Sequence, residues 1–263
     1  MANPFLNRED APIGSATWDF LSEQMVEIAR TQLSGRRLLD VEGPYGLGLK
    51  TVPLGEEEVS EGVSVSRSLP LAYLVRTFTL STRDLASYEA ETVNLDTNPL
   101  FEATQQECSL EDQTIFFGSG ELPGLTSAKG IHHRKLSAWD AVGQALEDLV
   151  QAVTLLDGAG YHGPYRLALA PQRYNLLFRI YPQAPITELE HLQQLVSGGI
   201  VKAPALQKGG VLLNAGAQYA ALILGQDMQL GFIGPSEDKL EFSVSESLAL
   251  LVRQPKSVCV LDE

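Results

Sequence analysis

The sequence predicts an α+β fold in which helices and strands alternate along the chain. Apolar residues recur every three or four positions in two long segments, residues 17–33 and 137–158, which is the spacing of amphipathic helices. From Gly199 onward, short apolar runs separated by glycine, proline and polar residues indicate strands. A further segment, residues 47–79, alternates without a matching core and predicts an extended β arm.

The first helix is expected to begin at Thr17, a good N-cap residue, and to end before Gly35. Its apolar face is formed by residues at steps of three and four, namely Trp18, Leu21, Met25, Ile28 and Leu33. After it, residues 36–42 are expected to form a short strand, and residues 43–46 a turn rich in glycine and proline.

The arm at residues 47–79 poses a packing problem. It contains few large apolar side chains and carries an acidic run at Glu56, Glu57 and Glu58. About thirty residues of this kind cannot bury enough apolar surface to offset the entropy lost on ordering. We therefore expect the arm to lie against the rest of the chain or against another subunit.

Three further helix starts can be recognised from capping residues. Ser81, with an acidic residue three positions later, predicts a short helix. Asp96 or Thr97 is expected to cap a longer helix, and Ser137, with Asp140 three positions later, to open a third one.

The next part of the chain mixes strands with short helices. Residues 165–169 are expected to form a strand, and Pro171 to lie in the first turn of a helix. Thr187 is expected to cap another helix after a loop containing two prolines. We find no internal repeat that would indicate a solenoid.

Composition excludes several classes of protein. The net charge of −14 and the scattered basic residues argue against nucleic-acid binding. No apolar run approaches the roughly 20 residues that cross a bilayer, and the N-terminal residues lack a signal peptide pattern, so a cytosolic protein without a membrane partner is expected. Cys108 and Cys259 stand alone, which argues against a disulfide framework or a structural zinc site.

The segment DVEGPYGLGLKT at residues 40–51 has the residue types of a phosphate-binding loop. Such a loop needs a second glycine followed at once by lysine, and then a helix. Counting from Gly43, the second glycine is Gly48, but Leu49 follows and Lys50 is one position late. An alternating segment comes next, so a hinge or turn is the preferred interpretation.

Other residues with chemical potential form no convincing catalytic group. The basic run His132–Lys135 is expected to be a solvated loop, and His162 and His191 to be exposed structural residues. The adjacent acids Glu111 and Asp112 face different ways on a helix and are assigned structural roles. We therefore expect no enzymatic activity, no metal site and no cofactor.

Several non-catalytic motifs occur in a characteristic order. They are TQLSGRR at residues 31–37 running into DVEGPYG, RSLPL at 67–71, TFTL at 77–80, EDQTIF at 111–116, GPY at 163–165 and LILGQDMQLGF at 222–232. Along essentially the whole chain, these motifs resemble the encapsulin shell proteins, a family first described as linocin-type bacteriocins.

This resemblance implies a fold and a division of the chain. The family has the fold of tailed-phage major capsid proteins, the Hong Kong 97 type, with a peripheral domain, an axial domain and an extended E-loop. By matching positions, the parts are the N-terminal helix and the start of the peripheral domain (1–46), the E-loop (47–79), the peripheral domain with its spine helix (80–136), the axial domain (137–234) and a return to the peripheral domain (235–263). The E-loop would pair with a neighbouring subunit.

The resemblance also implies a groove for a C-terminal peptide of a cargo enzyme. By matching positions, Arg36 and Asp40 are candidates for polar contacts, with Ile28, Leu33 and Leu38 as apolar walls. An apolar groove would bind the apolar side chains of such a peptide, and a few charged residues would fix its register. The alternative is that Ile28 and Leu33 are simply core residues.

The family places a five-fold pore at the loop before the Thr187 helix. Here the loop consists of Ile180, Tyr181, Pro182, Gln183, Ala184, Pro185 and Ile186, none of which carries a formal charge. Ion selection would then depend on size and backbone carbonyls. An ordinary connection between helices would use the same residues. Some family members bind flavin on an aromatic residue after the Phe-Thr-Leu motif, and Ser81, Thr82 and Arg83 offer none.

The resulting expectation is a cytoplasmic shell protein without catalysis of its own. It would form a homo-oligomer of about sixty subunits with icosahedral symmetry. A ferritin-like protein or a dye-decolourising peroxidase would be the enclosed cargo, for iron storage or defence against oxidative stress. Two alternatives are a phage or prophage major capsid protein, which would carry a pro-segment or scaffolding region, and a nucleotide-binding enzyme that uses Lys50.

Overall fold

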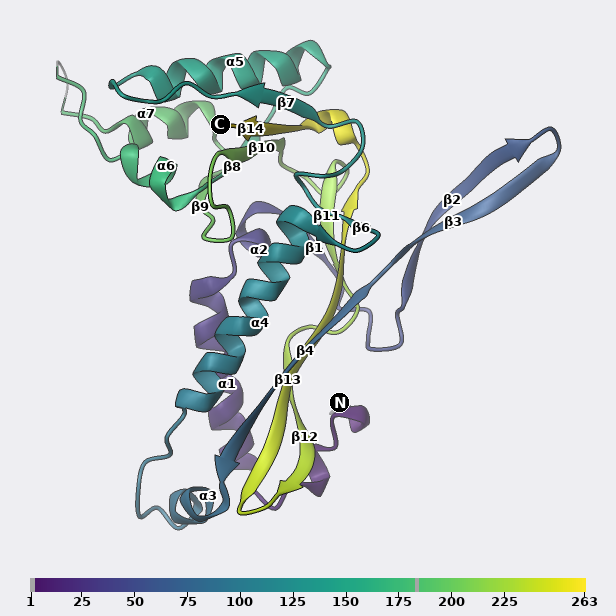
Figure 1. Cartoon of the computed structure of the whole chain (residues 1–263), viewed down its shortest axis with the longest axis vertical. Helices are drawn as coiled ribbons and strands as arrows, with labels where there is room; N and C mark the ends of the chain where they lie inside the picture. The colour runs from purple at the N-terminus through teal and green to yellow at the C-terminus, as the bar shows by residue number, and fades with distance from the viewer. Residues whose placement is uncertain (1–2, 183–184) are drawn as a thin grey trace. The chain divides into compact units, whose positions relative to one another are not determined.

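The computed structural model describes residues 3–182 and 185–263 (Figure 1). The chain divides into two compact units. The first unit contains the residues up to Leu33, Gly43–Glu111 and Leu224–Leu248. The second unit contains Ser34–Glu42, Asp112–Ile223 and Ala249–Glu263. Both helices and strands occur in each unit, which agrees with the α+β prediction.

The first unit combines helices with a sheet and a separate hairpin. Its elements are η1 (Pro4–Leu6), η2 (Arg8–Asp10), α1 (Ser15–Gln32), β2 (Thr51–Ser60), β3 (Val63–Pro70), β4 (Ala72–Ser81), α3 (Thr82–Glu89), most of α4 (Asn98–Phe117), β12 (Gln229–Ser236) and most of β13 (Lys239–Val252). Strand β13 pairs antiparallel with β12 on one edge and with β4 on the other.

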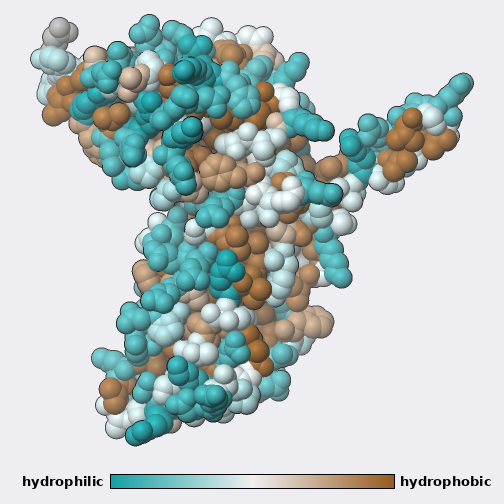
Figure 2. Space-filling model, viewed as in Figure 1, coloured by the Kyte–Doolittle hydropathy of each residue, from teal (hydrophilic) through white to brown (hydrophobic). Residues whose placement is uncertain are grey.

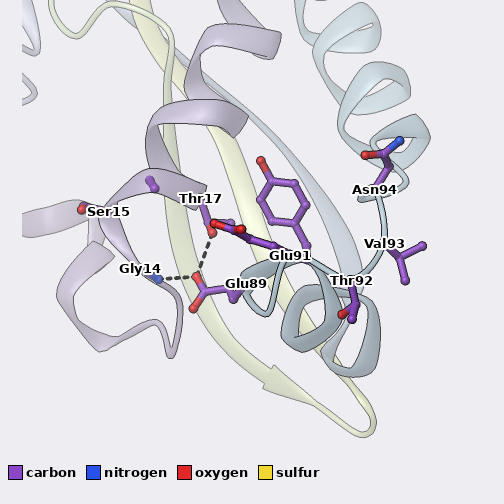
Figure 3. Close-up of a pocket in the computed structure, with 10 residues that line it drawn as sticks. Gly14, Ser15, Thr17, Glu89, Glu91, Thr92, Val93 and Asn94 are labelled. Atoms are coloured by element: carbon purple, nitrogen blue, oxygen red, sulfur yellow. Dashed lines mark hydrogen bonds between the residues drawn. The ribbon is translucent and has the colours of Figure 1, made fainter.

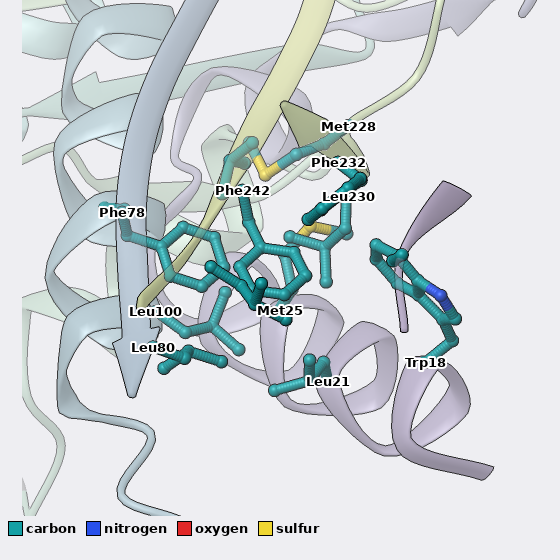
Figure 4. Packing of buried hydrophobic residues seen from close by; sticks show 14 of the residues in the cluster. Trp18, Leu21, Met25, Phe78, Leu80, Leu100, Met228, Leu230, Phe232 and Phe242 are labelled. Atoms are coloured by element: carbon teal, nitrogen blue, oxygen red, sulfur yellow. The ribbon is translucent and has the colours of Figure 1, made fainter. Parts of the chain in front are cut away.

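The core of the first unit is built around Phe242 of β13 (Figure 4). The ring centroid of Phe242 lies 5.5 Å from that of Phe78, 5.6 Å from that of Trp18 and 5.7 Å from that of Phe232. Leu21 and Met25 of α1 belong to the same cluster. The apolar face predicted for the first helix is therefore confirmed as a core face at Trp18, Leu21, Met25 and Leu33, whereas Ile28 is only half-buried.

The second unit contains a five-stranded sheet in the order β7-β14-β10-β8-β9. Its elements are α2 (Gly35–Leu38), β1 (Asp40–Glu42), β5 (Gly118–Ser119), β6 (Leu122–Pro123), β7 (His132–Lys135), α5 (Gln144–Gly158), β8 (Tyr165–Leu169), α6 (Pro171–Leu176), α7 (Glu188–Leu195), β9 (Ile200–Lys202), β10 (Gly210–Asn214), β11 (Ala220–Leu224), η3 (Pro255–Ser257) and β14 (Val258–Asp262). The apolar residues of α5 and α7 pack with those of β8 and β10 in one cluster.

Several local predictions are confirmed. Ser81 caps α3, and its side chain accepts a hydrogen bond from the Asp84 amide. Thr187 and Glu190 form a complete capping box at α7. The strand at residues 165–169 and the position of Pro171 at the start of α6 are also as predicted.

Other local predictions are wrong because side chains far away in the sequence determine where helices and strands begin. Helix α1 begins at Ser15, and Thr17 is a buried helical residue. Residues 36–38 lie in α2, and only Asp40–Glu42 form a strand. The helix expected at Ser137 begins instead at Gln144, because Asp148 accepts hydrogen bonds from the Ser137 amide, the Ser137 hydroxyl and the Trp139 indole.

Contacts within the single chain group some segments differently from the sequence-based division into domains, which stays a prediction. Residues 72–79 belong to β4, which is paired with β13, so the hairpin is shorter than the expected arm at 47–79. Strand β14 pairs with β10 and β7, so residues 249–263 belong to the second unit. The basic run His132–Lys135 forms strand β7 and is not a loop.

Helix α4 buries an acidic side chain in the first unit. Glu107 is fully buried, and neither of its carboxylate oxygens has a hydrogen-bond partner among the described residues. Burial raises the pKa of Glu107 from 4.5 to about 7; Arg76 opposes this shift, and Glu111 adds to it. The carboxyl group is therefore protonated in the folded chain at pH values where it ionises in the unfolded chain.

We predict that Glu107→Gln makes stability less dependent on pH. Because the folded-state pKa is raised from 4.5 to about 7, the stabilisation from the bound proton is complete below pH 4.5 and is lost as pH rises through 7. At pH 8, the free energy of unfolding of the glutamine variant should therefore be about 1–3 kcal/mol higher than that of the wild type. Urea unfolding from pH 4 to 8 measures this, with exposed Glu102→Gln on the same helix as the control. Parallel pH profiles for the wild type and Glu107→Gln would contradict it.

Candidate functional site

Strands β2 and β3 form a hairpin that pairs with no other described strand (Figure 1). Its antiparallel register runs from Thr51 opposite Pro70 to Ser60 opposite Val63. Two irregularities interrupt the pairing on β2, at residues 53–55 and 58–60. Apart from Val52 and Leu69, every residue in the two strands is exposed.

The hairpin is amphipathic although nothing in its unit covers it. Alternation along β3 places Val63, Val65, Arg67 and Leu69 on one face and Ser64, Ser66 and Ser68 on the other. On the valine face, Arg67 forms an ion pair with Glu57 of β2. Val63 and Val65 are each 49% exposed, and Val59 is 59% exposed. Figure 2 shows apolar patches among polar atoms on the hairpin. An isolated two-stranded ribbon is marginally stable in water, so this apolar face is suited to another surface.

The glycine-rich segment 43–48 connects to the base of the hairpin. Gly43 and Gly46 have φ values of +110° and +104°, which favour glycine. The Tyr45 amide donates to the Leu224 carbonyl over 3.0 Å, and the Leu71 amide donates to the Lys50 carbonyl over 2.9 Å. Strand β2, and not a helix, follows Lys50, so the geometry of a phosphate-binding loop is absent.

Two of the predicted peptide-binding residues belong to the first unit. Ile28 is half-buried on α1, whereas Leu33 is only 6% exposed. The open side of α1 instead presents Val26, which is 38% exposed. Val26 lies in a shallow hollow of about 300 Å³ together with Ser22, Glu23, Glu27 and Arg30. Sequence reasoning missed this face, although the spacing of residues 22, 26 and 30 places them together on a helix.

The other three predicted residues belong to the second unit. Arg36 is half-buried, and Leu38 has no exposed surface. Asp40 forms an ion pair with Arg166 of β8, with 2.8 Å between Oδ1 and Nη1. Arg166 Nη1 also donates to the Leu38 carbonyl over 3.2 Å. Leu33 and Leu38 are both buried in the single chain, and their assignment as groove walls stays a prediction.

The segment before Arg36 is held by a buried carboxylate on α4. Asp112 accepts hydrogen bonds from the Ser34 hydroxyl at 2.6 Å and from the amides of Ser34 and Gly35 at 3.0 and 2.8 Å. Burial raises the pKa of Asp112, while these hydrogen bonds and nearby Arg37 lower it in part. Asp112 therefore fixes the position at which α2 begins.

The predicted pore loop has a narrow base. Ile180 and Thr187 form an antiparallel bridge, and the Tyr181 amide donates to the Ile186 carbonyl over 3.0 Å. Ile180 is 61% exposed, and Pro182 and Pro185 are also exposed. Gln183 and Ala184, which were predicted to belong to this loop, lie outside the described residues.

A buried ion pair anchors this base. Glu188 is fully buried, and its Oε2 atom lies 2.8 Å from Arg179 Nη2. Glu188 Oε1 also accepts a hydrogen bond from the Gly143 amide at the start of α5, at 2.7 Å. Arg179 in turn donates to the Trp139 carbonyl. The charges near the loop are thus engaged in its support, while the described loop residues are neutral.

A hollow of about 800 Å³ lies at the start of α1, lined by residues 14–17, 88–89 and 91–94 (Figure 3). Glu89 points toward the helix start and accepts hydrogen bonds from the Gly14 amide and the Thr17 hydroxyl. These hydrogen bonds lower the pKa of Glu89. Because a carboxylate already occupies the positive end of α1, the hollow offers no free anion site there.

The described residues contain neither a metal-binding cluster nor a membrane-spanning helix. Within residues 3–182 and 185–263, no group of three or more His, Cys, Asp and Glu side chains is arranged to hold a metal ion. In the same part of the chain, no helix combines the length and apolarity needed to cross a bilayer.

The fold and motifs agree with comparisons to known proteins. A family described as "Encapsulating protein for peroxidase" matches residues 2–249 of the chain. The chain belongs to the encapsulin shell proteins. It is 30% identical to the type 1 encapsulin shell protein EncA of Myxococcus xanthus, covering 98% of this chain and 96% of that protein. It is 31% identical to the type 1 encapsulin shell protein of Rhodococcus erythropolis, covering 97% and 98%.

Solved structures support the capsid fold. A virus-like particle from Pyrococcus furiosus matches with a TM-score of 0.78 and 22% identity, covering 94% of this chain and 99% of that one. The capsid of Myoviridae phage XM1 matches with a TM-score of 0.65 and 13% identity, covering 87% and 89%. The predicted phage-capsid fold is therefore confirmed. Because the named relatives are shell proteins, the alternative of a nucleotide-binding enzyme is rejected.

We predict that Gly35→Ala displaces α2. A Cβ atom at Gly35 would lie 2.5 Å from Ile115 Cδ1 and 3.2 Å from Asp112 Oδ1, so the helix start must move away from α4. The free energy of unfolding should fall by about 1–3 kcal/mol, as measured by urea unfolding. Gly48→Ala is the matched control because a Cβ atom there meets nothing within 4 Å. Equal stability of the two variants would show that the contact is easily relieved.

Proposed function

We propose that this encapsulin shell protein self-assembles in the cytoplasm into a closed icosahedral compartment that encloses cargo proteins. The observation that carries this proposal is the hairpin of β2 and β3, whose apolar face is exposed in the single chain. A second copy of the chain is the partner that we propose for this face, and the edges of the two strands are also open because they pair only with each other within the described residues. Repetition of one contact around symmetry axes closes a shell of about sixty subunits.

The energetics of the hairpin favour assembly over a lone subunit. Full burial of a valine or leucine side chain contributes about 1.5–3 kcal/mol. Leu54, Val59, Val63 and Val65 are each about half exposed, so every subunit retains several such contributions for an interface. The free energy gained by burying one hairpin is modest, but the total becomes large when many copies join the same shell.

The cargo is proposed to be a ferritin-like protein or a dye-decolourising peroxidase, for iron storage or protection against oxidation. One relative, from Pyrococcus furiosus, is named a ferritin-like-encapsulin shell fusion protein and is 32% identical over 52% of this chain. Another, from Kuenenia stuttgartiensis, is named a diheme-cytochrome-encapsulin shell fusion protein. Each subunit has a net charge of −14, so a shell of such subunits would attract cations. This property suits an iron-handling cargo.

Cargo capture is assigned to the N-terminal helix and the segment that follows it. Of the residues predicted from the sequence, Ile28, Arg36 and Asp40 keep accessible surface and remain candidates. Asp40 would act together with Arg166, since the two already form an ion pair. Val26 is added to these candidates because its side chain is open to solvent on α1.

Small solutes are proposed to enter through the loop at residues 180–186. Ile180, Tyr181, Pro182, Pro185 and Ile186 carry no formal charge, and neither do Gln183 and Ala184 in the sequence. The clamp between Arg179 and Glu188 holds the loop base, so the aperture would select mainly by size.

A phage or prophage capsid protein is the second candidate because it shares the fold. The likeness to the XM1 capsid is only 13% in sequence and carries the fold alone. The 30% identity to a shell protein over nearly the full length of both chains favours the shell function.

We predict that Val63→Ser combined with Val65→Ser prevents shell formation. The change removes apolar surface from the hairpin face, and it should leave the subunit folded because both side chains touch solvent. Negative-stain microscopy should show hollow shells for the wild type and few or none for the variant, while circular dichroism remains the same. The control is Ser64→Ala combined with Ser66→Ala on the opposite face. Normal shells from the valine variant would refute the role of this face.

We also predict that Arg36→Glu lowers cargo loading without preventing assembly. Reversing the charge should weaken capture of a C-terminal cargo segment by about tenfold or more. Mass spectrometry of shells from the native host identifies the cargo, and a fluorescent protein that carries its C-terminal segment then reports loading per shell. Arg83→Glu on α3 serves as the control. Unchanged loading by the Arg36 variant would place capture elsewhere.

A further inference from the structure

Strand β7 is a basic edge of the sheet in the second unit. It pairs in parallel with β14, from His132 opposite Cys259 to Lys135 opposite Asp262, and lies at the end of the strand order. Its other edge pairs with no described strand. The sequence contains no other run of four successive His, Lys or Arg residues.

The cationic side chains of β7 are incompletely paired in the single chain. His133 is exposed and meets Asp262, with 3.0 Å between Nδ1 and Oδ2. Lys135 is also exposed. His132 Nε2 and Arg134 Nε are buried atoms without a hydrogen-bond partner among the described residues. Because those two atoms are buried within the chain, the positive charge that a partner could reach on this edge is carried chiefly by the exposed Lys135 and by the part of Arg134 that keeps accessible surface.

The hairpin carries the opposite charge near its turn. Glu56, Glu57 and Glu58 lie at the end of β2, and Glu61 lies in the turn before β3. All four are exposed. Glu57 has an intrachain ion pair with Arg67 at 2.9 Å, but both side chains are more than half exposed, so this pair contributes little.

We propose that the acidic end of the hairpin in one copy docks along the free edge of β7 in a neighbouring copy. This inference rests on the proposed self-assembly and names the surface that receives the hairpin. Strand β2 also has an unpaired edge, so its backbone can add to β7 as a further strand.

The alternation of side chains along both strands places opposite charges on each face of the docked pair. Glu56 and Glu58 point to one face of β2 and Glu57 to the other, while Arg134 and Lys135 point to opposite faces of β7. Each face of the new ladder therefore joins at least one carboxylate to one cation. On a chain with net charge −14, most other surfaces of the neighbour would repel the hairpin.

Charge reversal on both sides provides the test. The hairpin variant is Glu56→Lys with Glu58→Lys, and the edge variant is Arg134→Glu with Lys135→Glu. Each alone places like charges together, so the fraction of protein in shells should fall at least about tenfold at low salt. The combined variant restores opposite charges and keeps the net charge at −14, because two Glu→Lys changes add four charges and the two edge changes remove four. It should recover shells.

Size-exclusion chromatography with negative-stain microscopy measures shells, and circular dichroism verifies that each variant is folded. Glu9→Lys with Glu121→Lys controls for net charge at exposed positions outside the hairpin. Normal shells from either reversed variant, or no recovery in a folded combined variant, would overturn the docking while leaving self-assembly intact. A wild-type protein that stays monomeric would overturn both proposals.

A second measurement uses the wild-type shell and does not depend on variant folding. A carbodiimide condenses a carboxyl group with an amine that touches it, releasing water to the reagent and leaving an amide bond. We expect peptide mapping to find Lys135 joined to Glu56, Glu57 or Glu58 in assembled shells and unjoined in dilute monomers. Shells in which Lys135 is joined to none of these glutamates would overturn the docking surface.

Discussion

The central constraint on this protein is an apolar hairpin face that its own chain does not cover. Val63, Val65 and Leu69 of β3 lie on one side of the hairpin together with the exposed ion pair between Arg67 and Glu57, yet the two strands pair only with each other among the described residues. Water is a poor environment for that face, and a protein that must remain folded needs either a lid or a partner. The chain belongs to a family of shell proteins, and we propose that further copies of the same chain cover this face.

Structural features that depend on residues close together in the sequence were predictable, because the interactions that produce them are local. The apolar face of α1, the cap at Ser81 and the capping box at Thr187 each depend on residues within one or two helical turns. The amphipathic arm was also visible as simple alternation. Its length was not, since the assignment of residues 72–79 to a sheet depends on β13, far along the chain.

The details of the candidate site depend on contacts that a single sequence does not reveal. Arg166 reaches Asp40 from another strand, and Asp112 sets the start of α2 from a helix more than 70 positions away. Leu33 and Leu38 have suitable chemistry for a peptide groove, but packing places both in the interior. Periodicity identifies an apolar residue, and only the tertiary fold decides whether a ligand can touch it.

The acidic run on the hairpin has a consequence for the newly made subunit. An exposed pair of strands with valine side chains is a hazard for indiscriminate aggregation. Glu56, Glu57, Glu58 and Glu61 lie beside Val59, Val63 and Val65, so two free hairpins repel one another before their apolar faces can meet. The same carboxylates would thus limit contact between the exposed valine side chains of separate subunits before assembly.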